Sequence, residues 1–403
     1  MKIGIVGAGP SGIIAALEAR SQGAQVILFD ANPIVGRKLA ATGSGRCNLT
    51  NVHAQPKSYY TGSIDFLKAA FSQFGHKELV AWLNLHGILT YATQDGWVYP
   101  LSNSAQNIVD ILQAQLVCAG VEIHLRTLIS GIQEINHAFK LVTPDPEKYF
   151  IVDRVILAAG GPAFPQLGAR DNCYTILKQL GHAIEPKKPA LAPLLTEAGV
   201  FHKLQGVRLD VGVKLLVNEK IIGQTMGNII FTSWGLNGPG VMDISYLVSQ
   251  NSQMSLELEL DFLPYHFSDL QKGINQFKDQ AIPLASILES VLPFKVVKFI
   301  LDQCHLSVQK SLLDISKSEI EQIFYTLRHQ KVTVNGTKGF KESQVSIGGV
   351  PLHEINPTSM ESMIIEGLFL AGEMVDISGP CGGFNLQWAF TSGFVAGNHA
   401  GSQ

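Results

Sequence analysis

The chain has 403 residues, of which 46% are hydrophobic and 16% are charged, and its formal net charge is −3. That length predicts two or three domains, and the hydrophobic content supports a large core and excludes a disordered chain. Because 30 basic residues face 33 acidic ones, no overall basic field would hold a polyanion. We therefore expect no nucleic-acid partner.

The cysteines and the apolar segments indicate a cellular setting. The five cysteines are dispersed and form neither a CxxC pair nor a zinc-ligand spacing, a pattern typical of reduced thiols. The first seventeen residues are apolar, but glycines and a proline interrupt them, which favours strand–turn–helix over a leader or anchor. No other stretch approaches the roughly 18 apolar residues of a membrane-spanning helix. We expect a cytoplasmic protein with no membrane partner.

A βαβ unit opens the chain. A strand over 2–6 runs into the glycine turn GAGPSG at 7–12, a helix continues to about Gln22, and a second strand over 25–29 ends at Asp30. A glycine turn between a strand and a helix, with an acidic residue at this distance, predicts dinucleotide binding.

Each residue of this motif has a separate physical role. Gly7 permits the tight turn, Gly9 lets the backbone approach a pyrophosphate, and Gly12 allows the helix to pack closely on the strand. The helix N-terminus offers N–H groups to the phosphates. The Asp30 carboxylate can accept both ribose hydroxyls, and it disfavours a 2′-phosphate at this position.

Along the rest of the chain, the predicted secondary structure changes in type twice. After a loop at 36–51, the patterns predict helices over 63–75, 77–86 and 102–119, and strands over 121–125 and 151–158. From about residue 189 several strands are expected up to 262 with no helices between them, followed by helices over about 268–330 and a strand at 331–334. The chain closes with a strand over 368–371, a glycine-rich turn and a helix from about residue 383. The α/β pattern is therefore interrupted by an insert and then resumes.

Three segments favour FAD over NAD. The loop at 41–51 supplies backbone N–H groups and hydroxyls that can wrap an extended cofactor, with Arg37 or Arg46 offsetting phosphate charge. The buried strand before Ala159 delivers small residues that let the backbone lie against a dinucleotide. The strand over 368–371 leads to Glu373, whose carboxylate can bind the ribityl hydroxyls that NAD lacks.

The helix that begins near residue 383 has a reason to point at a flavin. Its positive N-terminal end would stabilise the negative charge that a reduced flavin carries at N1 and the C2 oxygen. An NAD dehydrogenase needs no such segment.

The chain resembles the BaiN/YhiN-like family of FAD-dependent oxidoreductases from end to end. The motifs that carry the resemblance are GAGPSG at 7–12, GRKLAATGSGRCNLTN at 36–51, YPLSNSA at 99–105, LAAGGPAFP at 157–165, KPALAPL at 188–194, FTSWGLNGPG at 231–240, SQVSIGGVPLHEINPTSMES at 343–362 and GLFLAGEMVDISGPCGGFNLQWAFTSG at 367–393. The resemblance implies an α/β fold with a discontinuous Rossmann-like FAD-binding domain (1–190 and 341–403), an inserted β domain (191–262 and 331–340) and a helical cap (263–330).

The motifs and the resemblance together give a set of expected FAD-binding residues. They are Gly7, Gly9, Pro10, Ser11, Gly12, Asp30, Ala31, Arg37, Lys38, Thr42, Ser44, Gly45, Arg46, Cys47, Asn48, Leu49, Ile129, Ala159, Gly160, Gly161, Gly372, Glu373, Gly383, Phe384, Asn385 and Leu386. Ile129, expected at the end of a strand, matches the position whose backbone meets the adenine in this family.

The reaction expected from the resemblance is hydride transfer between FAD and a small or medium organic substrate, in a cleft under the inserted domains. A reductase is favoured. No second GxGxxG follows a strand, so NAD(P)H, a candidate electron donor, would have to enter the same cleft as the substrate. The alternatives are an oxidase of a small amine or amino ketone that uses oxygen, and a flavin-binding regulatory protein with little turnover. The charge balance disfavours an RNA-modifying flavoenzyme.

No catalytic acid or base and no metal site emerges from the sequence. Cys47 and Cys381 fall on loops expected to border the flavin, but small residues that fit a tight loop are the favoured interpretation. The histidines show no metal-ligand spacing, and His53 is interpreted as structural. Trp234 and Asn237 are candidates for the substrate wall. Ser233 and Asn237 stand where the family carries other residues, which leaves the substrate open.

Overall fold

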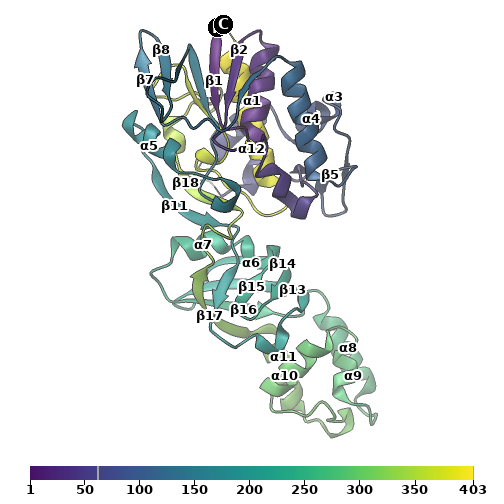
Figure 1. Cartoon of the computed structure of the whole chain (residues 1–403). Helices are drawn as coiled ribbons and strands as arrows, with labels where there is room; N and C mark the ends of the chain where they lie inside the picture. Colours follow the sequence, from purple (N-terminus) through teal and green to yellow (C-terminus); the bar gives the residue numbers. More distant parts are fainter. Residues whose placement is uncertain (61–62, 403) are drawn as a thin grey trace. The chain divides into compact units, whose positions relative to one another are not determined.

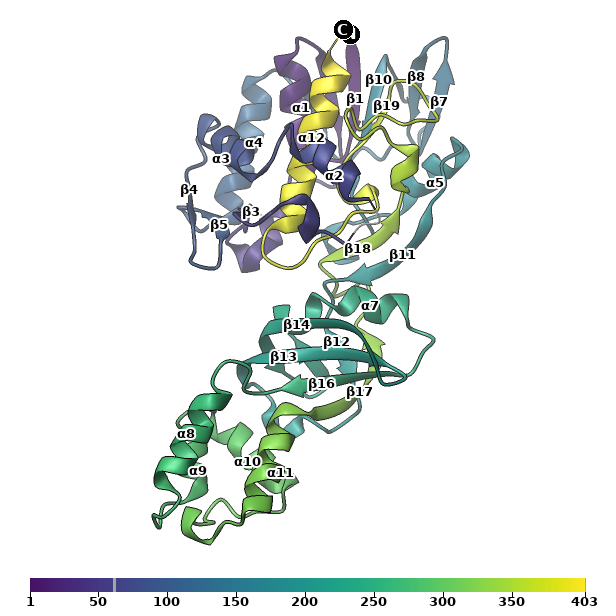
Figure 2. The ribbon, with the colours of Figure 1, turned by 180° about the vertical axis from the view of Figure 1, so that it is seen from behind.

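The structure, a computed structural model, describes residues 1–60 and 63–402. The chain forms two compact units, of which unit 1 contains Met1–Lys188 and the residues from Ser343 onward, and unit 2 contains Pro189–Glu342. Figures 1 and 2 show that the N-terminal segment (purple) and the C-terminal segment (yellow) both belong to unit 1. The two junctions lie two residues from those expected at 190/191 and 340/341. The division of the insert into a β domain and a helical cap stays a prediction.

A parallel sheet forms the centre of unit 1, with strand order β19-β10-β1-β2-β6. Its strands are β1 (Lys2–Val6), β2 (Gln25–Phe29), β6 (Glu122–His124), β10 (Arg154–Leu157) and β19 (Leu368–Leu370). All four pairings are parallel. The apolar residues of β1, β2, β10 and β19 are buried, as expected for strands covered on both faces, whereas the edge strand β6 is partly exposed. The strand at residue 368 therefore extends the sheet begun by the first thirty residues.

The α-helices of unit 1 are α1 (Pro10–Ser21), α2 (Ile64–Phe71), α3 (His76–Leu85), α4 (Ala105–Cys118), α5 (Asn172–Gln179) and α12 (Phe384–Gly401). Of these, α1 and α12 pack on the strands of the sheet. Helices α1 and α12 lie side by side in both views (Figures 1 and 2). At Gly393 and Gly397 an added Cβ would clash with the backbone of Ser11 and Ala15, so only glycine allows the two helices to approach so closely.

Three small sheets complete unit 1. They are β3 (Thr50–Asn51), β5 (Trp97–Pro100) and β4 (Thr90–Ala92); β7 (Gly131–Ile135), β8 (Ala138–Val142) and β9 (Tyr149–Val152); and the pair β11 (Glu185–Ala190) and β18 (Val345–Gly349). The single strand expected over 151–158 is wrong, because β9 and β10 belong to different sheets. Asp153 separates them: its N–H donates to Lys2 O at 2.8 Å, and its Oδ2 accepts from Lys2 N at 2.6 Å.

Unit 2 contains a closed barrel with strand order β12-β15-β14-β13-β16-β17. Its strands are β12 (Leu194–Thr196), β13 (Arg208–Val217), β14 (Lys220–Phe231), β15 (Gly235–Asn237), β16 (Leu256–Asp261) and β17 (Gln330–Thr337), and its later helices are α8 (Phe267–Phe277), α9 (Leu284–Leu288), α10 (Phe294–Gln303) and α11 (Lys317–Arg328). The expectation of no helices before residue 262 is wrong, since α6 (Pro239–Met242) and α7 (Ser245–Gln250) interrupt the strands. Such short apolar turns are too brief to show a helical period.

None of the helices formed by the described residues has both the length and the apolar character required to cross a bilayer.

Candidate cofactor site

The glycine turn between β1 and α1 places its three glycines in different surroundings. An added Cβ at Gly7, whose φ is +109°, would clash with Ala158 O, and one at Gly12 would clash with Gly7 O. An added Cβ at Gly9 would meet no atom within 4 Å. Gly7 and Gly12 are therefore needed for packing within the protein, whereas Gly9 borders open space, as the expected approach of its backbone to a pyrophosphate requires.

The N-termini of two helices in unit 1 are suited to bind an anion. Helix α1 follows Gly9 and α12 follows Gly383, so neither N-cap residue has a side chain that could cap its helix. Neither helix has an acidic residue in its first turn. A bound anion would be stabilised by the N–H groups and the dipole at each of these ends.

Asp30 is oriented by backbone donors beside the glycine turn. Its Oδ2 accepts from Ala8 N at 2.8 Å and its Oδ1 accepts from Asn32 N at 2.7 Å. Each carboxylate oxygen has two acceptor positions, so both oxygens keep the capacity to accept a ribose hydroxyl. The arrangement fits the role expected of Asp30.

Ile129 does not lie where a strand ends. It falls in the connection between β6 and β7, so its placement at a strand end was wrong. In the same connection, Thr127 N donates to the backbone oxygen of Asp30 at 2.9 Å, and the Ile129 carbonyl accepts from Asn172 Nδ2 at 2.9 Å. Loop contacts of this kind, and not strand pairing, position this segment.

The carboxylate of Glu373 joins segments that are far apart in the sequence. Lys38 Nζ lies 2.8 Å from its Oε2, and the N–H and hydroxyl of Ser346 both donate to its Oε1 at 2.9 Å. At Gly161 an added Cβ would lie 2.8 Å from the carboxyl carbon of Glu373, so glycine is needed to leave room for this group. Three of about four acceptor positions are used, which leaves one for a ribityl hydroxyl.

Ser346 is a residue that reasoning from the sequence missed. The only signal was its place in the motif at 343–362, to which no role was assigned. Its two hydrogen bonds orient the carboxylate of Glu373, so it supports the expected ribityl contact from β18.

The loop after Lys38 has an unusual backbone. Gly43, Ser44, Gly45 and Cys47 all have positive φ, at 57°, 56°, 84° and 63°, a region in which non-glycine residues are strained. Cys47 is fully buried, and burial raises the pKa of its thiol to about 12. The Cys47 side chain is thus a packed thiol, in agreement with its interpretation as a small residue fitting a tight loop.

Arg46 points away from the core. Its guanidinium carbon lies 4.8 Å from the centre of the Tyr99 ring, on which it stacks. An added Cβ at the neighbouring Gly45 would meet no atom within 4 Å, as at Gly9 and Gly160. These glycines border space that the described residues leave open.

The same loop is joined to the start of α12. Asn51 Nδ2 donates to Gly382 O at 2.9 Å, and Thr50 Oγ1 donates to Gln387 Oε1. At Gly383, whose φ is +97°, an added Cβ would clash with Thr50 O. The structure therefore brings the loop at 41–51 into direct contact with the last predicted cofactor segment.

Asn385 shapes the turn before this helix. Its Oδ1 accepts from Gly379 N at 2.9 Å, and its Nδ2 donates to Gly379 O at 2.8 Å. The side chain is thus used within the protein, and a cofactor contact at this position would come from the backbone. Arg37 is similarly engaged, since it donates to Asn32 Oδ1 at 3.1 Å and to Gln166 O at 3.0 Å.

The remaining expected residues lie within these same segments of unit 1. They are Pro10, Ser11, Ala31, Thr42, Asn48, Leu49, Ala159, Gly372, Phe384 and Leu386. The substrate-wall candidates Trp234 and Asn237 belong to unit 2, where Lys338 Nζ lies 3.9 Å from the centre of the Trp234 ring.

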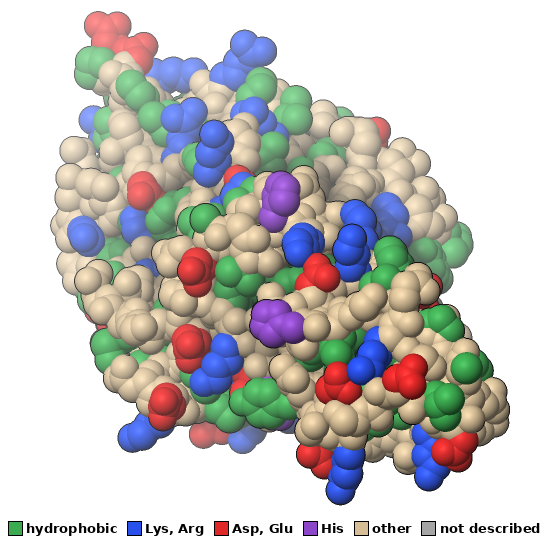
Figure 3. Space-filling model, turned by 90° about the horizontal axis from the view of Figure 1, so that it is seen from below, with side chains coloured by type: hydrophobic (Ala, Val, Ile, Leu, Met, Phe, Trp, Pro, Cys, Tyr) green, Lys and Arg blue, Asp and Glu red, His purple; other side chains and the backbone are tan. Residues whose placement is uncertain are grey.

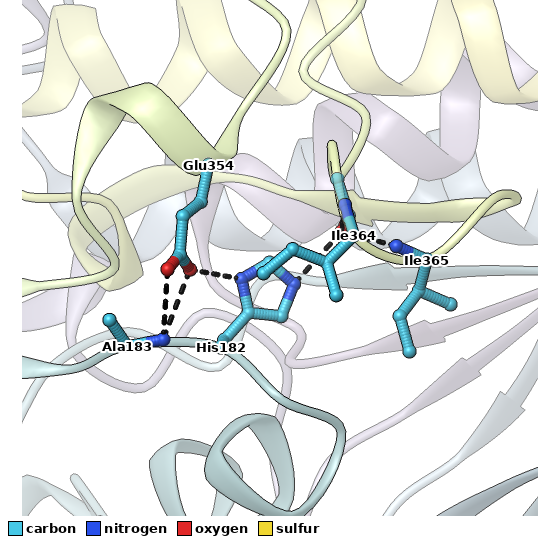
Figure 4. A network of polar contacts seen from close by, with 6 residues as sticks. His182, Ala183, Glu354, Ile364 and Ile365 are labelled. Atoms are coloured by element: carbon cyan, nitrogen blue, oxygen red, sulfur yellow. Dashed lines mark hydrogen bonds and ion pairs between the residues drawn. The ribbon is translucent and has the colours of Figure 1, made fainter.

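A second polar network in unit 1 has the composition of a hydrolase triad, but not its accessibility (Figure 4). His182 Nδ1 lies 2.7 Å from Glu354 Oε2, and its Nε2 lies 2.9 Å from Ser362 Oγ. The same Ser362 oxygen accepts from the N–H groups of Ile364 and Ile365 at 3.0 and 2.9 Å. Because the His182 side chain is 0% exposed and Ser362 is buried, the network holds the 352–365 segment against the end of α5 and has no role as a nucleophile.

Comparison with known proteins supports the cofactor interpretation. A family model described as the HI0933-like protein Rossmann domain matches residues 1–399. The chain is 32% identical to a 3-dehydro-bile acid delta(4,6)-reductase of Clostridium scindens, over 99% of this chain and 98% of that protein. It is 30% identical to proteins named ribosomal RNA dihydrouridine synthase from Haemophilus influenzae and Escherichia coli, over 97% of this chain and 96% of each.

Solved structures agree in fold. A 3-ketosteroid-delta4-(5alpha)-dehydrogenase from Rhodococcus jostii matches with a TM-score of 0.50 and 14% identity, over 100% of this chain and 96% of that one. A 3-ketosteroid delta1-dehydrogenase from Sterolibacterium denitrificans matches with a TM-score of 0.51 and 12% identity, over 99% of both chains. At such low identity these likenesses show the fold alone.

Proposed function

Since the chain belongs to the HI0933-like Rossmann family and is an FAD-dependent oxidoreductase, we propose that it reduces a ring carbon–carbon double bond conjugated to a carbonyl group. The family that the motifs predicted is confirmed, and so is the predicted Rossmann-like FAD-binding fold. The substrate and the direction of the reaction belong to the proposal.

One observation carries the proposal: two kinds of relatives with different substrates share one type of bond change. The name of the first describes a reductase of a 3-dehydro bile acid at delta(4,6), and double bonds so placed are conjugated to the 3-oxo group. The name of the second describes a synthase of dihydrouridine, which is uridine whose C5–C6 double bond, conjugated to the C4 carbonyl, has been reduced. We take this shared bond change, and neither substrate, to be what this chain inherits.

The overall reaction adds a hydride to the carbon β to the carbonyl and a proton to the α carbon. When bound, FAD supplies the hydride chemistry. The chain contributes the binding groups described above: Asp30 for the ribose, Glu373 with Lys38 and Ser346 for the ribityl chain, and the α12 N-terminus for the negative charge of the reduced ring. NAD(P)H is the proposed electron donor, entering the same site as the substrate.

We favour a small uncharged ring ketone over RNA as the substrate. Several basic side chains in unit 2 are paired with acids, as in Lys203–Asp302, Lys310–Glu319 and Arg328–Asp261. In Figure 3, basic and acidic side chains alternate over the lower part of the face drawn. Phosphate binding needs a surplus of basic groups, and the net charge of −3 provides none.

The second candidate is reduction of uridine in RNA. It is favoured by the relatives named ribosomal RNA dihydrouridine synthase, which match 97% of this chain. The conjugated double bond of uracil suits the same hydride chemistry, so only a direct comparison of substrates separates the two.

The test is anaerobic reoxidation of the reduced holoenzyme, followed by flavin absorbance. Separate samples receive a 4,6-dien-3-one steroid, the saturated 3-oxo steroid of the same skeleton as matched control, and a uridine-containing ribosomal RNA fragment. We expect rapid reoxidation by the dienone and none by the saturated ketone. Reoxidation by the RNA alone would establish the second candidate. A further sample is opened to air, and reoxidation there with none in the other samples would indicate an oxidase. A flavin that neither NADH nor NADPH reduces beforehand would indicate a regulatory protein.

A further inference from the structure

Gln387 is a fully buried amide in the first turn of α12. Its side chain belongs to a chain of hydrogen bonds whose members Thr50, Gln387 and Thr391 are all 0% exposed. Its Oε1 accepts from Thr50 Oγ1, and its Nε2 donates to Thr391 Oγ1 at 2.9 Å. Thr391 Oγ1 in turn donates to Phe74 O at 2.8 Å. Both ends of the amide are therefore bound by protein groups, so any effect of Gln387 on a cofactor must act through those groups.

The bond between Thr50 and Gln387 lies where the loop at 41–51 touches the start of α12. An added Cβ at Gly383 would lie 2.4 Å from Thr50 O, so the two backbones are in contact. Asn51 Nδ2 donates to Gly382 O at 2.9 Å beside them. The helix begins after a glycine and has no capping side chain from its N-cap residue. The loop thus holds the helix end that is suited to bind an anion.

A buried amide at this place needs a physical reason. Burying an amide is unfavourable unless both its ends are hydrogen-bonded, and a leucine would fill the same space without that requirement. What the amide adds is direction, because its hydrogen bonds are made in one arrangement of loop and helix. The dipole of a helix acts mainly within the first turn. The orientation of residues 384–387 therefore decides how strongly α12 stabilises a nearby negative charge.

We propose that Gln387 is a positioning residue for FAD, which fixes the N-terminus of α12 against the loop at 41–51 through its bond to Thr50. It makes no contact with the cofactor. When the bond is lost, the first turn of α12 is aligned less well with the negative charge of the reduced flavin, and the reduced form loses more stabilisation than the neutral oxidised form. The proposal rests on FAD binding, but not on which substrate is reduced.

The test uses Thr50→Val and Gln387→Leu in the full-length protein, since each removes the bond with little change of volume. The dissociation constant for FAD should rise about two- to fivefold in each variant, and the reduction potential of the bound flavin should fall. The double variant should lose no more than the more affected single variant, because both changes remove the same interaction. Thr50→Ser keeps the hydroxyl and should retain the affinity and the potential of the unaltered protein.

Thr143→Val is the matched control, because Thr143 is another buried threonine of unit 1. Its Oγ1 donates to Asp145 O at 3.0 Å and to Lys148 O at 2.8 Å in the connection between β8 and β9. Thr143→Val should lower the unfolding temperature and leave FAD affinity and potential unchanged. The proposal is overturned if Thr50→Val and Gln387→Leu behave like this control, or if Thr50→Ser is as impaired as Thr50→Val. None of these measurements requires the substrate, so failure here is distinct from failure of the proposed reaction.

Discussion

Replacing Glu373 by glutamine removes one negative charge from the place where Lys38, Ser346 and Gly161 meet, while keeping the shape of the side chain. In the structure one acceptor position of the carboxylate is left after Lys38 and Ser346 are satisfied. A single hydrogen bond to a charged group contributes about 1.5–3 kcal/mol. The Lys38 side chain is 32% exposed, so water can solvate it when its partner is lost, and that loss adds no more than about 1 kcal/mol.

The expected result is FAD binding weakened by roughly 10- to 150-fold. Titration of the FAD-free protein, followed by quenching of flavin fluorescence, measures the dissociation constant directly. Lys38→Gln and the double variant complete a cycle that separates the ion pair from the bond to FAD. If Glu373→Gln binds FAD within about twofold of the unaltered protein, then the carboxylate does not contact the cofactor and the reasoning fails.

Four further outcomes are expected. Gly161→Ala should weaken FAD binding, because its Cβ would lie 2.8 Å from the Glu373 carboxyl carbon and displace it; unchanged affinity in a titration would contradict this. His182→Ala should lower the free energy of unfolding by about 3 kcal/mol in urea melts, since it leaves Glu354 and Ser362 without their buried partner; a loss below about 1 kcal/mol would show that the network contributes little. Iodoacetamide at mildly alkaline pH should label exposed Cys118 but not buried Cys47 in the folded protein, as peptide mass mapping would show. Burial raises the pKa of the Cys47 thiol from 9.0 to about 12. The protonated thiol therefore contributes fully to the free energy of unfolding below pH 9.0, and this contribution is lost as the pH rises toward 12. Burial also raises the pKa of Asp376, so its charged form opposes folding at neutral pH; Asp376→Asn should therefore raise the melting temperature at neutral pH, with a gain that shrinks as pH falls below its folded pKa, and an equal gain at all pH values would refute this.

The parts of the site that could be predicted are those set by local sequence. The turn at 7–12 and Asp30 belong to one βαβ unit, in which strand, turn and helix fix one another within thirty residues. The strand before Glu373 could likewise be predicted from its own short apolar run. Local patterns therefore identified the carboxylates expected to bind the cofactor before any contact was known.

Contacts between distant segments could not be predicted. Lys38 and Glu373 are 335 residues apart, and no periodicity shows that they form an ion pair or that Ser346 completes the group. The break at Asp153 was missed because apolar residues on both sides hide a change of sheet. The helices α6 and α7 were missed because tertiary packing, rather than propensity, forms such short turns.

The position of unit 2 within the chain has a consequence for synthesis. The ribosome completes residues 189–342 before Ser346, Glu373 and α12 exist. The interrupting unit can therefore fold while the unit around it still lacks two strands and its longest helix. Ser11 and Ala15 of helix α1 then remain exposed until α12, which carries Gly393 and Gly397, is synthesised and packs against them. Cofactor capture is therefore expected to be among the last events in the maturation of each molecule, and a nascent chain stalled shortly before residue 373 would be colourless.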